Sequence, residues 1–130
     1  MNDTERYEAG LAVRREVLGT EYVDRSLKSA DDFSGPFQDF VSRYCWGDVW
    51  CRNGLERKQR SLINLAMIAA LNRPHELKLH ILGALNNGLT RDEIREVFLQ
   101  VMVYCGAPAG LDAARLAREV FAEVDTQGAK

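Results

Sequence analysis

The sequence has no long apolar run and no strong excess of charge. Its 130 residues carry a net charge of −2 with acidic and basic residues mixed, and no basic or aromatic-basic face predicts binding to nucleic acid. No apolar segment approaches the ~20 residues of a membrane-spanning helix. The first ten residues, MNDTERYEAG, lack the apolar core of a signal peptide. We therefore expect a cytoplasmic protein that binds neither nucleic acid nor membrane.

Cysteine and histidine are also scarce. The three cysteines, Cys45, Cys51 and Cys105, are an odd number without CxxC spacing, which argues against a disulfide framework and a dithiol redox centre. The two histidines, His75 and His80, are five residues apart and point in different directions from one helix. They cannot chelate a metal as an i,i+4 pair would. We expect free thiols and no metal site.

The apolar pattern that is present is helical almost throughout, with no competing strand pattern. Gly19 ends the first helix, and Thr90 with Glu93 forms a capping box that opens another. The length fits one domain, residues 1–130. We predict an all-α fold of about six helices, over residues 4–18, 34 to about 47, 55–71, about 74–87, about 91–105 and a last segment that starts near Gly106 and Pro108.

The predicted helix at residues 55–71 is apolar on nearly every side over its second half. A helix of this kind has to be covered all round, by other helices or by another subunit. A monomer of this size has too little other surface to cover it, so the pattern favours a homo-oligomer.

Polar side chains that could take part in catalysis or binding occur in two places. Glu76 and His80 are one turn apart at the edge of the apolar face of one predicted helix. The second place is VSRYCWGDVWCRNGLERKQR, which sets cations beside aromatic rings just before the most apolar helix. That combination suits a small anionic organic ligand. Its candidates are Arg43, Tyr44, Trp46, Trp50, Arg52, Arg57, Lys58 and Arg60.

Each candidate also has a structural interpretation. A lone histidine on a helix is often a satisfied structural residue, and Glu76 can pair with Arg73 or support His80. The charges of ERKQR suit a solvated first turn, Trp46 suits a core or interface anchor, and Tyr104 suits a helix end. The residues alone therefore predict a helical domain with an anion pocket and leave these alternatives open.

Two groups of motifs carry a resemblance to a known family. RYEAGLAVRREVLG, VDRSL and FQDFVSRYCWGDVW resemble the 4-carboxymuconolactone decarboxylases. The segment from ELKLH to YCGAPAG is shared more widely, with an alkyl-hydroperoxidase-D-like superfamily, and indicates its helical fold. Peroxidase relatives carry a CxxC before the histidine. Aligned on His80, those cysteine positions hold Arg73 and Glu76 here, which argues against thiol peroxidase chemistry.

The resemblance implies a cofactor-free carboxy-lyase of protocatechuate catabolism, and a hexamer. Its substrate is 4-carboxymuconolactone, a lactone with two carboxylates, and its products are 3-oxoadipate enol-lactone and CO2. Three other interpretations stay open: a related lactone decarboxylase or isomerase on the same fold, a peroxidase partner protein, or a non-catalytic helical oligomerisation module.

Site roles follow from the chemistry that the resemblance implies. His80, with a reference pKa near ~6.5, is the expected proton donor, and Glu76 would orient it or relay the proton. The carboxylate that stays on the substrate would be bound by arginine, and the lactone ring and its oxygen by aromatic side chains. The predicted substrate-binding residues are Arg43, Arg57 and Arg60 for the carboxylate, Trp46 for the ring and Tyr104 for the lactone oxygen.

Overall fold

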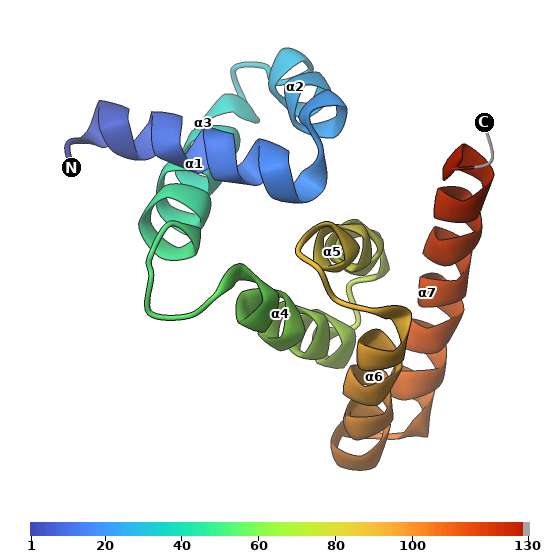
Figure 1. Ribbon diagram of the computed structural model, residues 1–130. Helices are drawn as coiled ribbons and strands as arrows, with labels where there is room; N and C mark the ends of the chain where they lie inside the picture. The colour runs from blue at the N-terminus through green and yellow to red at the C-terminus, as the bar shows by residue number, and fades with distance from the viewer. Residues whose placement is uncertain (129–130) are drawn as a thin grey trace. The chain divides into compact units, whose positions relative to one another are not determined.

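The computed structural model describes residues 1–128, in which every regular element is a helix (Figure 1). This confirms the predicted all-α fold, with seven α-helices and one π-helix in the described residues rather than about six helices. No helix among them is long and apolar enough to cross a membrane. The elements are α1 (Asp3–Leu18), α2 (Thr20–Lys28), α3 (Gly35–Phe40), the π-helix η1 (Val41–Trp50), α4 (Arg57–Leu71), α5 (Pro74–Asn86), α6 (Arg91–Cys105) and α7 (Ala107–Gly128).

The chain divides into two compact units. The first, Met1–Arg57, contains α1, α2, α3 and η1, and the second begins at Lys58 and contains α4 to α7. The candidate residues are divided between them, because Arg43, Trp46 and Arg57 belong to the first unit. Arg60, Glu76, His80 and Tyr104 belong to the second.

In the first unit, α1 and η1 pack backbone against backbone. A Cβ atom on Gly10 would collide with the backbone of Ser42 and Gly47, and one on Gly47 would collide with the backbone of Arg6. Only glycine permits so close a crossing. In η1 the hydrogen bonds run from residue i to i+5, and one such bond ends it, from the Cys51 amide to the Trp46 carbonyl at 3.1 Å. Helices of this kind are rare and are often found at functional sites.

Two expectations for the first unit were wrong. The sequence predicted a helix that ends near Gly47 and a loop after it, but η1 continues to Trp50. Gly47 stands at a helix crossing and does not terminate a helix. The second error is the omission of α2, a short helix in which only Val23 is buried.

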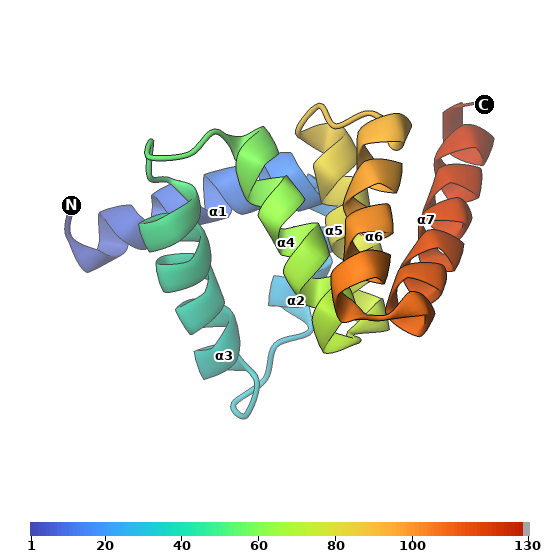
Figure 2. The ribbon, with the colours of Figure 1, turned by 90° about the horizontal axis from the view of Figure 1, so that it is seen from below.

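The second unit has the predicted helix boundaries and a continuous core. Pro74 lies in the first turn of α5, and the capping box of α6 is formed, with Thr90 and Glu93 exchanging backbone-to-side-chain hydrogen bonds of 2.9 and 3.0 Å. Helices α6 and α7 lie side by side in both ribbon views (Figures 1 and 2). The buried core residues are Leu65, Ala69, Leu77, Ile81, Ala84, Leu89, Ile94, Phe98, Val101, Ala113, Ala117 and Val120.

Candidate functional site

His80 is a half-buried side chain on α5. Leu77 and Ile81, on either side of it along the helix, are buried in the core and fix the direction in which the imidazole points. Its Nδ1 atom lies 3.5 Å from the Asn64 side-chain nitrogen on α4. At this distance the Asn64 amide and the imidazole can share a hydrogen bond.

Burial lowers the pKa of His80 from its ordinary value, and the charge of Glu76, one turn earlier on α5, partly opposes that effect. The loss of hydration is the larger of the two influences. The imidazole is therefore mainly neutral at pH 7. Glu76 favours the protonated form, but its influence is smaller than that of burial.

Arg60 shares a stripe of α4 with Asn64, because residues four apart lie on one side of a helix. Arg60 is half-buried, so this stripe carries a cation one turn from the amide that contacts His80. The sequence analysis selected Arg60 and missed Asn64. The available signal was an asparagine inside a strongly apolar helix, in register with Arg60.

Tyr104, near the end of α6, faces a different side of α4 from Arg60 and Asn64. Its side chain is 82% exposed at the end of α6 and lines a groove of about 600 Å³ together with Leu62 and Ala66. These two α4 residues are about half a turn away from Arg60 and Asn64. Within the second unit, the structure therefore does not bring Tyr104 to His80, and its site role stays a prediction.

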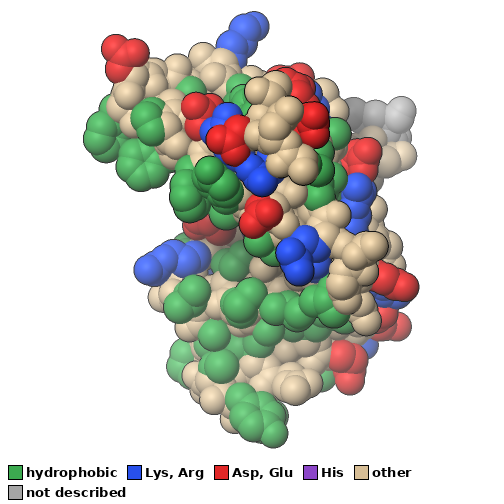
Figure 3. Space-filling view, turned by 90° about the vertical axis from the view of Figure 1, so that its left-hand side faces the viewer, with side chains coloured by type: hydrophobic (Ala, Val, Ile, Leu, Met, Phe, Trp, Pro, Cys, Tyr) green, Lys and Arg blue, Asp and Glu red, His purple; other side chains and the backbone are tan. Residues whose placement is uncertain are grey.

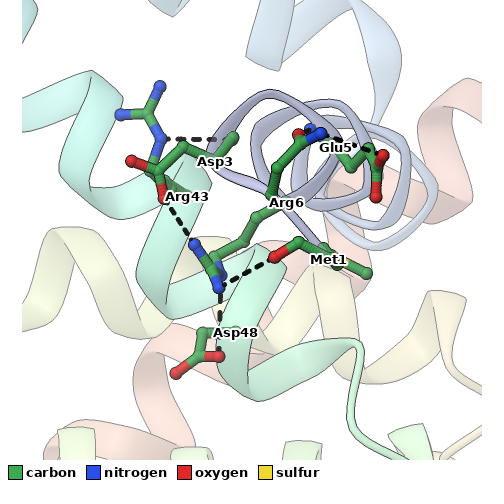
Figure 4. Close-up of polar contacts among 7 residues, drawn as sticks. Met1, Asp3, Glu5, Arg6, Arg43 and Asp48 are labelled. Carbon is green, nitrogen blue, oxygen red and sulfur yellow. Dashed lines mark hydrogen bonds and ion pairs between the residues drawn. The ribbon is translucent and has the colours of Figure 1, made fainter.

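The candidate residues of the first unit have protein partners. Arg43 donates from Nε to the Asp3 carbonyl at 3.4 Å (Figure 4). Its guanidinium also lies over the Tyr7 ring at 5.3 Å. Arg57 is exposed and forms an ion pair with Glu16. Each would have to exchange or share these contacts to bind a substrate carboxylate.

Trp46 is buried and stacks on Trp50, with ring centroids 4.7 Å apart and planes inclined by 25°. This packing supports the anchor interpretation and leaves the role as a wall for the substrate untested. Arg6 of α1 pairs with Asp3 of its own helix at 2.6 Å and with Asp48 of η1 at 3.7 Å (Figure 4).

One buried cation was not selected from the sequence. Arg14 on α1 is only 5% exposed, and its Nη1 donates to the Ser42 hydroxyl of η1 at 3.2 Å. Burial lowers its pKa, against the opposing influence of Tyr22, Tyr7 and Cys45. The signal in the sequence was the register of Arg14 with Leu11 and Leu18 on the buried stripe of α1. Its neighbour Arg15 is outside this stripe and pairs with Asp24 at the surface.

The thiols and the possible metal ligands do not form a reactive centre. Cys45 and Cys105 are exposed and Cys51 is half-buried, and all three are free, as predicted. Burial raises the pKa of the Cys51 thiol, with smaller effects from Arg57 and Glu16. Among residues 1–128, no three His, Cys, Asp or Glu side chains are grouped so that they could hold a metal ion.

Comparison with known proteins identifies the family of this chain. The model of the carboxymuconolactone decarboxylase family matches residues 35–119, from α3 into α7. The chain belongs to this family. It is 48% identical over 124 residues to the 4-carboxymuconolactone decarboxylase of Acinetobacter baylyi, covering 95% of this chain and 92% of that protein.

Two further relatives extend the comparison within the carboxymuconolactone decarboxylase family. The nitrosuccinic acid decarboxylase of Metarhizium robertsii is 42% identical over 122 residues, covering 94% of this chain and 85% of that protein. A 4-carboxymuconolactone decarboxylase sequence of Pseudomonas putida is 48% identical over 48 residues, covering 37% of this chain and all of that sequence. The identity to the first two relatives therefore includes both units.

Proposed function

We propose that this protein decarboxylates 4-carboxymuconolactone to 3-oxoadipate enol-lactone and CO2, in cytoplasmic protocatechuate catabolism. The observation that carries the proposal is the 48% identity over 95% of the chain to a protein named for this reaction. A half-buried histidine, with a carboxylate and an amide beside it, supplies a group suited to the proton transfer that the reaction requires.

The reaction needs no external electron acceptor. The carbon–carbon bond to the ring carboxylate breaks, CO2 leaves, and the electron pair passes into the conjugated lactone to give a furanolate. One proton then adds to the ring carbon next to the carbonyl. The protein has to hold the substrate, meet the charge that develops on the lactone oxygen, and supply that proton.

His80 would deliver this proton, although burial keeps it mainly neutral before substrate binds. The substrate carries two negative charges, and nearby negative charge raises the pKa of an imidazole. Substrate binding would therefore favour protonation of His80, which then carries the proton that the reaction consumes. Glu76 acts in the same direction and would hold or relay the proton.

Cations would bind the carboxylate that remains on the product. Arg60 is favoured among the predicted arginines because it lies one turn from Asn64, the contact of His80, on the same stripe of α4. Trp46 and Tyr104 keep their predicted roles at the ring and the lactone oxygen. The departing carboxylate would occupy a less cationic place, because strong pairing there would stabilise the ground state.

Nitrosuccinic acid is the second candidate substrate, because a relative named for its decarboxylation is 42% identical over 94% of the chain. It is also a dicarboxylate that carries its own electron sink, since a nitro group accepts the electron pair released with CO2. A protein of this kind would use the same proton donor and the same cation for the remaining carboxylate.

A direct assay separates the candidates. Purified protein is added to freshly generated 4-carboxymuconolactone, and CO2 release and the enol-lactone are followed; nitrosuccinic acid is tested in parallel. We expect a kcat/KM for the lactone well above that for nitrosuccinic acid. The opposite order would move the assignment to the second substrate, and no turnover of either would leave the non-catalytic module as the better interpretation.

We also propose a homo-oligomer, most simply a hexamer. The apolar helix α4 keeps Ile63, Met67 and Leu71 exposed at a spacing of four, so one stripe of it is uncovered. Val103 and Tyr104 of α6 are also exposed, and hydrophobic side chains gather over the lower half of the face in Figure 3, at the height of α4 and α6 in Figure 1. Sedimentation at micromolar concentration tests this proposal, and a monomer would contradict it.

A further inference from the structure

Arg14 is the one buried arginine among residues 1–128, and its hydrogen bonding is incomplete. Its Nη1 atom donates to the Ser42 hydroxyl, while its Nε atom is closed to solvent and has no partner. Buried polar groups are nearly always hydrogen-bonded, so an exception calls for an explanation. A missing partner for Nε is the simplest one.

The charge of Arg14 is uncompensated as well. The titratable groups that act on it, Tyr22, Tyr7 and Cys45, include no carboxylate. No carboxylate of the described residues forms an ion pair with it, in contrast to Arg15, which pairs with Asp24 at 2.9 Å. A buried charge without a counter-ion is strongly destabilising, so a role in stability does not account for it.

The edge of the guanidinium that lacks a partner has the shape of a carboxylate site. Nε and Nη2 lie on one side of the group, and together they donate two parallel hydrogen bonds to a carboxylate. Ser42 occupies Nη1 and so leaves this side-on edge unused. Because Nε is closed to solvent, a ligand would reach it only with a small shift of the side chain or its cover.

The surroundings favour a flat organic anion. Ser42 lies on the buried stripe of η1 that also carries Trp46 and Trp50, and these two rings are stacked. An aromatic-rich stripe that begins at the serine in contact with a buried cation suits a planar ring that bears a carboxylate. The wide turns of the π-helix place these residues on one stripe at a spacing of four.

We propose that Arg14 binds the substrate carboxylate that is not lost in the reaction. This assignment rests on the proposed function for the identity of the substrate. A permanent charge in a dry setting stabilises whichever carboxylate it contacts, in the ground state and in the transition state alike. It would slow the reaction if it held the carboxylate that leaves, so it is suited to the one that stays.

The test compares Arg14→Met with the control Arg15→Met, its neighbour at the surface. Arg14→Met removes an uncompensated charge and keeps much of the side-chain volume, so we expect a higher Tm than that of the unmodified protein together with a KM raised about tenfold or more. The kcat should change much less, because binding is lost equally in both states. Arg15→Met should leave KM unchanged.

A second readout does not depend on turnover. Muconolactone keeps the acetate carboxylate of 4-carboxymuconolactone and lacks the ring carboxylate. It should raise the Tm of the unmodified protein and of Arg15→Met, and it should raise that of Arg14→Met by much less. If the protein turned over neither candidate substrate but showed this pattern, the proposed function would fail and the carboxylate site of Arg14 would stand.

Other outcomes would overturn the proposal. A lower Tm for Arg14→Met with an unchanged KM per folded protein would show that Arg14 is structural. If that variant does not fold, Arg14→Lys decides, because it keeps the charge but lacks the side-on edge. A folded Arg14→Lys protein that binds muconolactone as tightly as the unmodified protein would exclude carboxylate binding through that edge.

Discussion

The two units can be compared through one nitrogen base in each, Arg14 and His80, on which burial has different consequences. Burial lowers the pKa of Arg14 in the first unit and of His80 in the second. The ordinary pKa of histidine is near ~6.5, so His80 becomes mainly neutral, whereas arginine starts so high that it stays charged. Burial therefore leaves His80, in the second unit, as a group that can exchange a proton. It leaves Arg14, in the first unit, as a group with a permanent charge.

Removal of the imidazole should have the largest effect. A positioned acid typically contributes ~10²–10⁴-fold, so His80→Ala should lower kcat by a factor of that order while KM changes little. Glu76→Gln should lose less, because it keeps the imidazole and only lowers its pKa. Rate and thermal stability are measured on the same preparations. Near-normal turnover per folded His80→Ala site would make His80 a structural residue.

Replacement of the cation on α4 should act on binding. Arg60→Ala should raise KM by roughly ten- to a hundredfold with a smaller change in kcat, since a charge-assisted hydrogen bond contributes ~1.5–3 kcal/mol in both states. Arg95→Ala is the matched control, because Arg95 is exposed and pairs only with Asp92 in its own helix. Equal KM values for the two variants would remove Arg60 from the site.

The effect of pH on stability tests the state of His80 directly. Its pKa is lowered in the folded protein, so the unfolded chain binds the proton first as pH falls below ~6.5. The His80 contribution to the free energy of unfolding should therefore be constant above that pH and decrease below it. Urea unfolding of the unmodified protein and of His80→Gln at pH 7.5 and 5.5 measures this. A loss of the same size in both would contradict the assignment.

The thiols should contribute nothing to turnover. Replacement of Cys45, Cys51 and Cys105 by serine together should leave kcat within about twofold, since none contacts the candidate proton donor among the described contacts and all are free. A chelator should likewise leave the rate unchanged. Loss of turnover in a well-folded triple variant would restore a role for sulfur chemistry.

The sequence predicted best where local signals determine the structure. Pro74, the Thr90–Glu93 capping box and Gly19 mark helix ends through their own backbone chemistry, and the structure confirms each. The family assignment is confirmed in the same way, because its motifs are continuous in the chain.

What the sequence could not predict depends on contacts between distant segments. The π-helix η1 is stabilised where α1 crosses it, so its hydrogen-bond pattern cannot be read from VSRYCWGDVW alone. The register of Arg14 with Leu11 and Leu18 could be seen in the sequence, but its contact with Ser42, 28 residues away, could not. The role of Asn64 depends on its contact with His80, which forms only when α4 packs against α5.

The crossing of Gly10 with Gly47 constrains the spacing of the chain as well as the identity of its residues. With both backbones in contact, α1 cannot slide along η1 by one residue without placing a side chain at the crossing. Counted from the glycine crossing, the four-residue interval from Gly10 to Arg14 and the five-residue interval from Ser42 to Gly47 therefore together determine whether Arg14 and Ser42 meet. One residue inserted between Gly10 and Arg14 would rotate the guanidinium about 100° away from Ser42, although every residue of the site would still be present.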